Sequence, residues 1–100
     1  MIVRIFDTAA APEDIPKGIE LFKERTQPAF ERFPGCHGIE MLIGAVEHSA
    51  DLVEIAAISR WDSIDAAEAA INTPEYEEAL AELRKLFQQA PIVRYFEAVD

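Results

Sequence analysis

The order of apolar segments is the strongest constraint on the fold of this chain. Apolar runs typical of strands occupy residues 2–8, 36–46, 52–61 and 92–99, and the two longer stretches between them show helical spacing. The resulting order, strand, helix, strand, strand, helix, strand, is that of the ferredoxin-like split βαββαβ motif. We therefore predict an α+β fold with a four-stranded antiparallel sheet, in which the first and third strands are central and the helices cover one face.

The first helical segment is predicted to begin at Pro12 and Asp14 and to continue to about Phe33. Its apolar stripe consists of Ile15, Ile19, Phe22, Thr26, Ala29 and Phe33. Pro28 lies off this stripe, so its missing N–H is expected to bend the helix on the solvent side and to leave the buried face uninterrupted. The dipeptide Pro34-Gly35 ends the helix.

The second helical segment is predicted to consist of two pieces. Asp62 is the expected N-cap of the first piece, and Thr73 is the expected N-cap of the second, with Pro74 at its first helical position. The apolar stripe of the second piece consists of Tyr76, Ala79, Leu80, Leu83, Leu86 and Phe87, and Pro91 ends it. The polar residues 47–51, with His48 on the turn surface, indicate a hairpin between the second and third strands.

The alternation of side chains assigns each strand residue to one face of the sheet. The predicted helix-facing set is Val3, Ile5, Val53, Ile55, Ala57, Trp61, Val93 and Tyr95, and the opposite set is Arg4, Phe6, Glu54, Ile58, Arg60, Arg94 and Phe96. The second set is too apolar to be left in water, yet it contains charges. We therefore predict that it meets a second copy of the chain, with Glu54 pairing with Arg4 or Arg94; an exposed amphipathic sheet face is the alternative.

Composition limits the class of protein. One hundred residues with 50% hydrophobic content provide one core, so a single domain over residues 1–100 is expected. A formal net charge of -10 repels nucleic acid and anionic lipid surfaces. No apolar run approaches the roughly 20 residues of a membrane helix, and residues 1–6 have the pattern of a strand instead of a signal peptide, so a cytoplasmic location is expected. One cysteine and two histidines provide neither a disulfide nor a metal-ligand set.

Several local features accompany this order of elements: the Pro34-Gly35 turn, the strand end Trp61-Asp62-Ser63, and the helix restart Thr73-Pro74-Glu75-Tyr76. In these features and over nearly its whole length, the chain resembles the antibiotic biosynthesis monooxygenase family of dimeric α+β barrels. The resemblance implies a homodimer whose sheets back onto each other, and a small-molecule pocket between the helices and the sheet of each subunit. It also implies a cofactor-independent monooxygenase, because enzymes of the family oxidise polycyclic phenols or quinols with molecular oxygen and without metal or flavin.

Of the residues that the family uses, only Trp61 carries over to this chain. The polyketide-oxidising branch has an asparagine four residues before the tryptophan, where this chain has Ala57. The haem-degrading branch has a second tryptophan and a histidine at the positions of Ala70 and Leu80, and its first-strand asparagine falls near Asp7. The resemblance therefore implies neither haem nor any other cofactor.

The candidate site residues form two groups. His37, at the start of the second strand, and Asp7 are the candidate proton acceptors for a phenolic substrate. Trp61, Tyr76 and Tyr95 are the candidate substrate-binding residues, because their rings either line an aromatic pocket or fill the core. Since fold alone does not decide between catalysis and binding, the alternative function is a non-catalytic dimeric module that binds a small ligand or serves as an accessory subunit.

Overall fold

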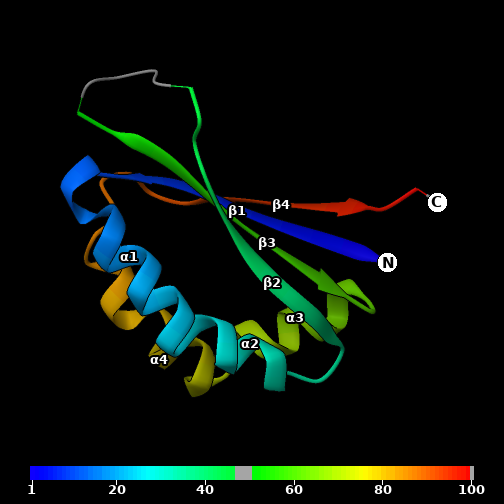
Figure 1. The fold of residues 1–100 in the computed structure, drawn as a ribbon. Coiled ribbons are helices and arrows are strands. Elements are labelled where there is room, and N and C mark those ends of the chain that lie inside the picture. The colour runs from blue at the N-terminus through cyan, green and yellow to red at the C-terminus, as the bar shows by residue number, and fades with distance from the viewer. Residues whose placement is uncertain (47–50, 100) are drawn as a thin grey trace.

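The computed structural model of the protein describes residues 1–46 and 51–99. Figure 1 shows the order β1, α1, α2, β2, β3, α3, α4, β4, which confirms the predicted βαββαβ arrangement, with each helical segment divided in two. The strands are β1 (Ile2–Ala10), β2 (Cys36–Ile43), β3 (Val53–Trp61) and β4 (Ile92–Glu97), and the helices are α1 (Ile15–Leu21), α2 (Gln27–Arg32), α3 (Ile64–Ile71) and α4 (Pro74–Arg84). The predicted turn that includes His48 falls on residues 47–50, which lie outside the described part of the chain.

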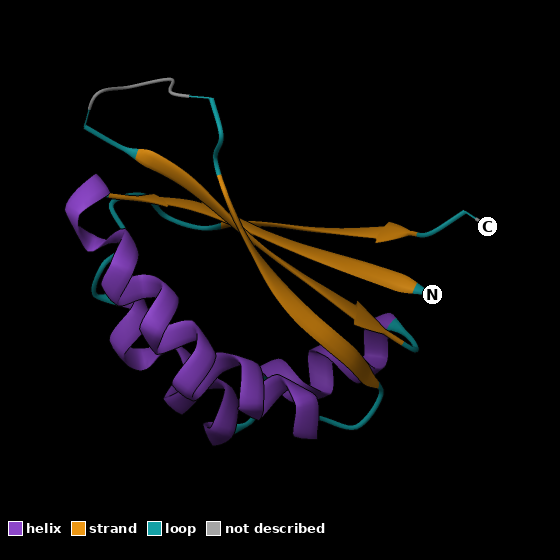
Figure 2. Ribbon diagram, viewed as in Figure 1, coloured by secondary structure: helices purple, strands orange, loops and turns teal. Residues whose placement is uncertain are grey.

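The strands form one antiparallel sheet in the order β2-β3-β1-β4, with β1 and β3 central as predicted. Figure 2 shows that all helices lie on one side of this sheet, so that its other face is uncovered in the single chain. Across the sheet, Phe6 of β1 lies opposite Ala57 of β3 and Val93 of β4. Residues that lie opposite one another share a face, and this register therefore identifies the helix-facing side.

The first helical segment changes its pitch in the middle. Between α1 and α2 lies a π-helical turn, Phe22–Thr26, in which the Gln27 N–H donates to the carbonyl of Phe22, five residues earlier. Pro28 follows at once and has no N–H to give to the preceding turn, so the wider turn occurs where the α-helical pattern would lose a hydrogen bond. The predicted buried face persists across it, because Phe22, Thr26, Ala29 and Phe33 are all buried.

The caps of the second helical segment differ in one respect from the prediction. Thr73 caps α4 as predicted, since its hydroxyl accepts the N–H of Tyr76 at 3.3 Å and Pro74 is the first helical residue. The prediction that Asp62 caps α3 was wrong. Ser63 does so instead and accepts the N–H of Ala66 at 3.1 Å. The Asp62 carboxylate instead lies against His37.

The prediction of which β1 side chains face the helices was also wrong. Arg4 and Phe6 lie on the helix side, with 5% and 8% of their surface exposed, and Val3 and Ile5 face the uncovered side. Because β1 carries apolar residues on both faces, alternation alone gives no preference. The assignments made for Ile55 and Trp61 of β3 were correct, since both are buried on the helix side.

This correction changes the composition of the uncovered face. Glu54 cannot pair with Arg4, which lies on the other side of the sheet, and the ion pair described on this face joins Arg60 to Glu40 at 3.4 Å. The face nevertheless keeps large apolar side chains, including Ile92 and Phe96, which are 55% and 49% exposed. Its mixed apolar and charged character therefore remains.

No helix within residues 1–46 and 51–99 has the length and hydrophobicity needed to cross a lipid bilayer.

Candidate functional site

A small cavity lies between the helix-facing side of the sheet and the helices, and we call it the helix–sheet cavity. Its volume is about 30 Å³, room for one or two water molecules. Most of its wall is apolar and comes from Phe22 and Phe30 on one side and Met41 and Ile55 on the other. The polar residues that line it are Arg4, Thr8, Thr26, Ser59 and Tyr76. An apolar chamber with a few convergent polar groups is the usual form of a small-molecule site.

Arg4 is the one charged side chain among these lining residues. It sits on β1 between Ser59 of β3 and Tyr95 of β4. Its Nη2 donates to the Tyr76 hydroxyl at 3.2 Å, and its guanidinium lies 5.8 Å and 5.7 Å from the ring centres of Phe6 and Tyr76. Its Nε is buried without a hydrogen-bond acceptor among the described residues.

Tyr76 is held by the start of α4. The Thr73 cap and Pro74 fix the first turn, so the Tyr76 ring points toward the sheet and is 3% exposed. A second contact secures the helix, because the Thr26 hydroxyl donates to the carbonyl of Ala79 at 2.8 Å. The π-helical turn and α4 thus position the polar groups of the cavity together.

Trp61 lies in the core beside this cavity and is not among the described residues that line it. It is 1% exposed, and its Nε1 donates to the Ser59 hydroxyl at 2.8 Å. Its ring contacts Phe30 at 6.0 Å and is stacked on Phe33 at 6.3 Å between centres. With its only polar group satisfied and its surface buried, Trp61 fills the corner between β3 and α3.

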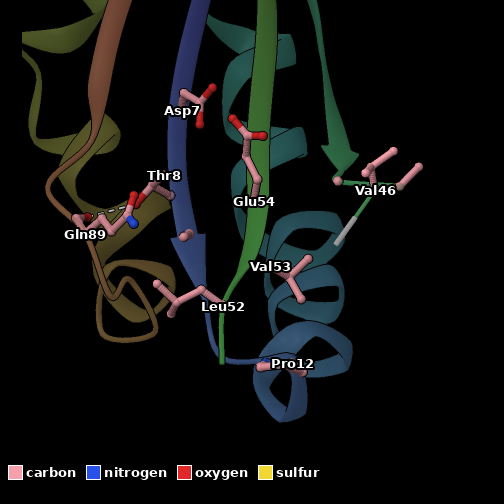
Figure 3. A pocket seen from close by; sticks show the side chains of 11 residues that line it. Asp7, Thr8, Pro12, Val46, Leu52, Val53, Glu54 and Gln89 are labelled. Atoms are coloured by element: carbon pink, nitrogen blue, oxygen red, sulfur yellow. Dashed lines mark hydrogen bonds between the residues drawn. The ribbon is translucent and has the colours of Figure 1, made fainter. Parts of the chain in front are cut away.

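A second, larger concavity of about 410 Å³ opens at one end of the sheet, and we call it the edge concavity. Figure 3 shows Asp7 of β1 and Glu54 of β3 with their carboxylates close together. The Thr8 hydroxyl donates to the carbonyl of Gln89 at 2.8 Å. Burial raises the pKa of the Asp7 carboxyl above its ordinary value of 3.8, and Glu54 adds to this through hydrogen bonding and charge repulsion, while Arg94 opposes it. The pair therefore gives this concavity an acidic wall.

The two candidate proton acceptors lie apart from the helix–sheet cavity. Asp7 lines the edge concavity, and His37 is on the surface at the start of β2, where its Nε2 lies 2.5 Å from Asp62 Oδ1. Cys36 does not pair with its neighbour His37; its thiol lies 3.7 Å from the Gly38 carbonyl oxygen, and burial raises its pKa. The structure thus brings neither His37 nor Asp7 to Tyr76.

The remaining candidate, Tyr95, lies opposite Arg4 in the register of β1 and β4 and packs against the core cluster that contains Trp61 and Tyr76. In the part of the chain that the structure describes, no three His, Cys, Asp or Glu side chains are grouped so that they could hold a metal ion. Of the predicted substrate-binding residues, Tyr76 is the one that lines the helix–sheet cavity.

Comparison with known proteins identifies the family. The family model described as antibiotic biosynthesis monooxygenase matches residues 1–89. The chain belongs to the antibiotic biosynthesis monooxygenase family. Among curated proteins, no sequence matches it.

Several solved structures share this fold, and one of them is named an antibiotic biosynthesis monooxygenase. This monooxygenase superposes with a TM-score of 0.75 at 18% identity, over 100% of both chains. Rv0793 from Mycobacterium tuberculosis gives 0.72 at 15% identity, over 99% of this chain and 95% of its own. A mutant of SnoaB, a cofactor-independent oxygenase from Streptomyces nogalater, gives 0.70 at 19% identity, over 99% of this chain and 94% of its own. At these identities, the likeness extends to the fold alone.

The sequence analysis did not predict that Arg4 lines the helix–sheet cavity. The signal was present, because a single arginine interrupts the apolar run Ile2-Val3-Arg4-Ile5-Phe6. It was assigned to the uncovered face, where a charge costs little. The register with Ser59 and Tyr95 places it on the helix side instead.

Proposed function

We propose that this protein is a cofactor-independent monooxygenase that oxidises a small aromatic or quinol-like molecule in the helix–sheet cavity. The observation that carries the proposal is the cavity itself, in which Arg4 and the Tyr76 hydroxyl meet among apolar and aromatic walls. Membership of the antibiotic biosynthesis monooxygenase family supports the reaction class, and SnoaB is an oxygenase of the proposed kind.

The proposed reaction needs no external reductant. When a ring CH₂ of a phenol's keto tautomer becomes a carbonyl, one oxygen atom of O₂ enters the product and the other leaves as water. The substrate supplies the electrons, so the task of the protein is to exclude water, orient the ring and favour the electron-rich anion that attacks oxygen. Since Asp7 and His37 lie away from the cavity, we propose that a water molecule accepts the proton of the substrate. Asp7 or His37 could accept it, as predicted, only from a ligand that extends beyond the cavity.

The cavity must enlarge to admit an aromatic ring, because sites for small molecules usually measure roughly 300–1,000 Å³. Several of its walls are side chains that can change rotamer without moving the backbone. Met41 is unbranched and adapts its shape readily, and Leu80 and Leu83 project from α4 into the same space. We therefore expect the ligand to enter by displacing these side chains.

We further propose that the protein acts as a homodimer in the cytoplasm. The uncovered face supports the dimer, because it presents Ile92 and Phe96 beside the charges of Glu54 and Arg94. The alternative, a non-catalytic module that binds a small ligand, shares the same cavity and differs in having no turnover.

Oxygen consumption tests the proposed function. The purified protein, in the presence of a metal chelator, should consume oxygen with at least one member of a panel of polycyclic phenols, anthrones and quinols. Ala57→Leu, which fills the cavity, should reduce the rate by at least about tenfold, while Ala69→Leu on the exposed side of α3 should leave it unchanged. Thermal unfolding of both variants confirms that they are folded.

Two results would contradict the proposal. Ligand binding without oxygen uptake across the panel would favour the non-catalytic module. An oxygen-consuming reaction that Ala57→Leu leaves intact would place the reaction elsewhere on the molecule.

A further inference from the structure

Arg4 is a buried cation that has no counter-ion among the residues that the structure describes. Its side chain belongs to a residue that is 5% exposed, and no carboxylate within residues 1–46 and 51–99 lies at ion-pair distance from it. An arginine guanidinium carries a positive charge and has no hydrogen-bond acceptor of its own. Its one hydrogen bond to a side chain goes to the neutral hydroxyl of Tyr76, and its Nε–H has no acceptor.

The surrounding rings compensate this charge only in part. Phe6 and Tyr76 each approach the guanidinium at just under 6 Å, which is within the range of cation–π attraction. Removing an ion from water costs more free energy than such contacts return, even after the protein relaxes. Cation–π contacts therefore do not offset the burial, and no carboxylate in the described part of the chain pairs with Arg4 to do so.

We infer that the ligand of the helix–sheet cavity carries an anionic oxygen, and that Arg4 is the cation that pairs with it. This inference rests on the cavity being the ligand site proposed above. It assigns the substrate class as an aromatic oxyanion, either a ring carboxylate or an ionised phenol.

The geometry of Arg4 fits this class. The unpartnered Nε–H and an N–H of Nη2 lie on the same edge of the guanidinium. The two oxygens of a carboxylate, or the single oxygen of a phenolate, can accept hydrogen bonds from both N–H groups. The Tyr76 hydroxyl already accepts from Nη2, so its own proton is free to be donated to the same anion. Most of the remaining lining residues, among them Phe22, Met41 and Leu83, are apolar and suit a ring.

Binding measurements in the wild-type protein test the inference without any variant. Isothermal titration calorimetry at pH 7 under nitrogen compares 2-naphthoate with the neutral 2-naphthamide, and the acid should bind about 10- to 100-fold more tightly. Titration of 2-naphthol across pH separates the two sources of the oxyanion. Its affinity should rise as the phenol ionises, whereas that of 2-naphthoate should stay constant.

Three variants assign this preference to Arg4. Arg4→Met keeps the length of the side chain, and it should remove the preference for the acid without lowering the melting temperature. Arg4→Lys keeps the charge but not the planar fork, so it should retain part of the preference. Arg25→Met removes a surface arginine as the matched control and should bind as the wild type does.

Each alternative result overturns the inference. If the wild-type protein binds the acid no more tightly than the amide, or binds neither, then the cavity does not recognise an anion. A preference for the acid that survives in Arg4→Met would assign recognition to another group. These measurements involve no turnover, so they can fail separately from the proposed oxygenase. If the protein binds the acid selectively but consumes no oxygen, only the proposed oxygenase is contradicted. If it consumes oxygen and Arg4→Met does not change the rate, only this inference is contradicted.

Discussion

Replacement of Trp61 tests whether this residue is a structural plug. Its ring is 1% exposed, packs on Phe30 and Phe33, and donates its N–H to Ser59. The helix–sheet cavity lies beside it, but Trp61 does not form part of the cavity wall that the structure describes. We therefore expect its replacement to change the free energy of unfolding and to leave ligand affinity unchanged.

The size of the effect follows from the buried area. A tryptophan ring of roughly 200 Å² at about 25 cal/mol per Å² stabilises the fold by about 5 kcal/mol, near the ~3–5 kcal/mol measured for truncation of buried aromatic residues to alanine. Trp61→Phe keeps one ring, loses roughly 80 Å² of that burial, and leaves the Ser59 hydroxyl without its donor. It should cost about 2–3 kcal/mol, of which about 1 kcal/mol is the lost hydrogen bond.

Urea denaturation followed by far-ultraviolet circular dichroism measures these differences without relying on tryptophan fluorescence. The double variant Trp61→Phe with Ser59→Ala should recover about 1 kcal/mol relative to Trp61→Phe, because it removes the unpaired hydroxyl. Trp61→Phe with wild-type stability and a weakened affinity for the ligand would refute the reasoning. It would make Trp61 a wall of the binding site.

Two further predictions concern the uncovered face. The pKa of Asp7 is raised in the folded state, so the folded protein keeps a proton on Asp7 at pH values at which the unfolded chain has lost it. The contribution of Asp7 to stability is therefore full below pH 3.8 and declines as the pH rises through its folded-state pKa. In urea denaturation, Asp7→Asn should therefore gain stability relative to the wild type as the pH rises above 3.8, and a difference that does not vary with pH would contradict this. In sedimentation at micromolar concentration, the protein should have twice its mass of 11.2 kDa, Phe96→Asp should be monomeric, and Val99→Asp at the 96% exposed position should stay dimeric; a monomeric wild type would contradict the dimer.

The sequence predicted the elements of this fold well because each has a local signal. Pro34-Gly35 ends the first helical segment, Thr73 with Pro74 begins α4, and alternation along β3 identifies the buried side that includes Trp61. The misassigned cap had no decisive local signal. Asp62 and Ser63 are both good caps, and in the structure Ser63 accepts the helix N–H while the Asp62 carboxylate lies against His37, which is distant in sequence.

The site was harder to predict because it depends on the face that β1 turns to the helices. Among the predicted site residues, Tyr76 could be placed from the helical stripe of α4, and it does line the cavity. Arg4 could not be placed, because β1 has apolar residues on both of its faces. Which face meets the helices is not defined until the pairing of β1 with its neighbouring strands is known. Those partners, Ser59 and Tyr95, are 55 and 91 residues away along the chain.

The orientation of β1 explains why the cavity contains a cation. Either face of this strand carries one charge within its apolar pattern, Arg4 on the side of Phe6 and Asp7 on the side of Ile5. Whichever face meets the helices therefore brings a charge into the core. A carboxylate placed among aromatic rings would face their negative surfaces, whereas the guanidinium of Arg4 is attracted to the rings of Phe6 and Tyr76 and finds a hydroxyl acceptor. The observed orientation is thus the less costly of the two, and it leaves Asp7 on the open face and an unmatched positive charge in the cavity, where a bound anion would complete the pair.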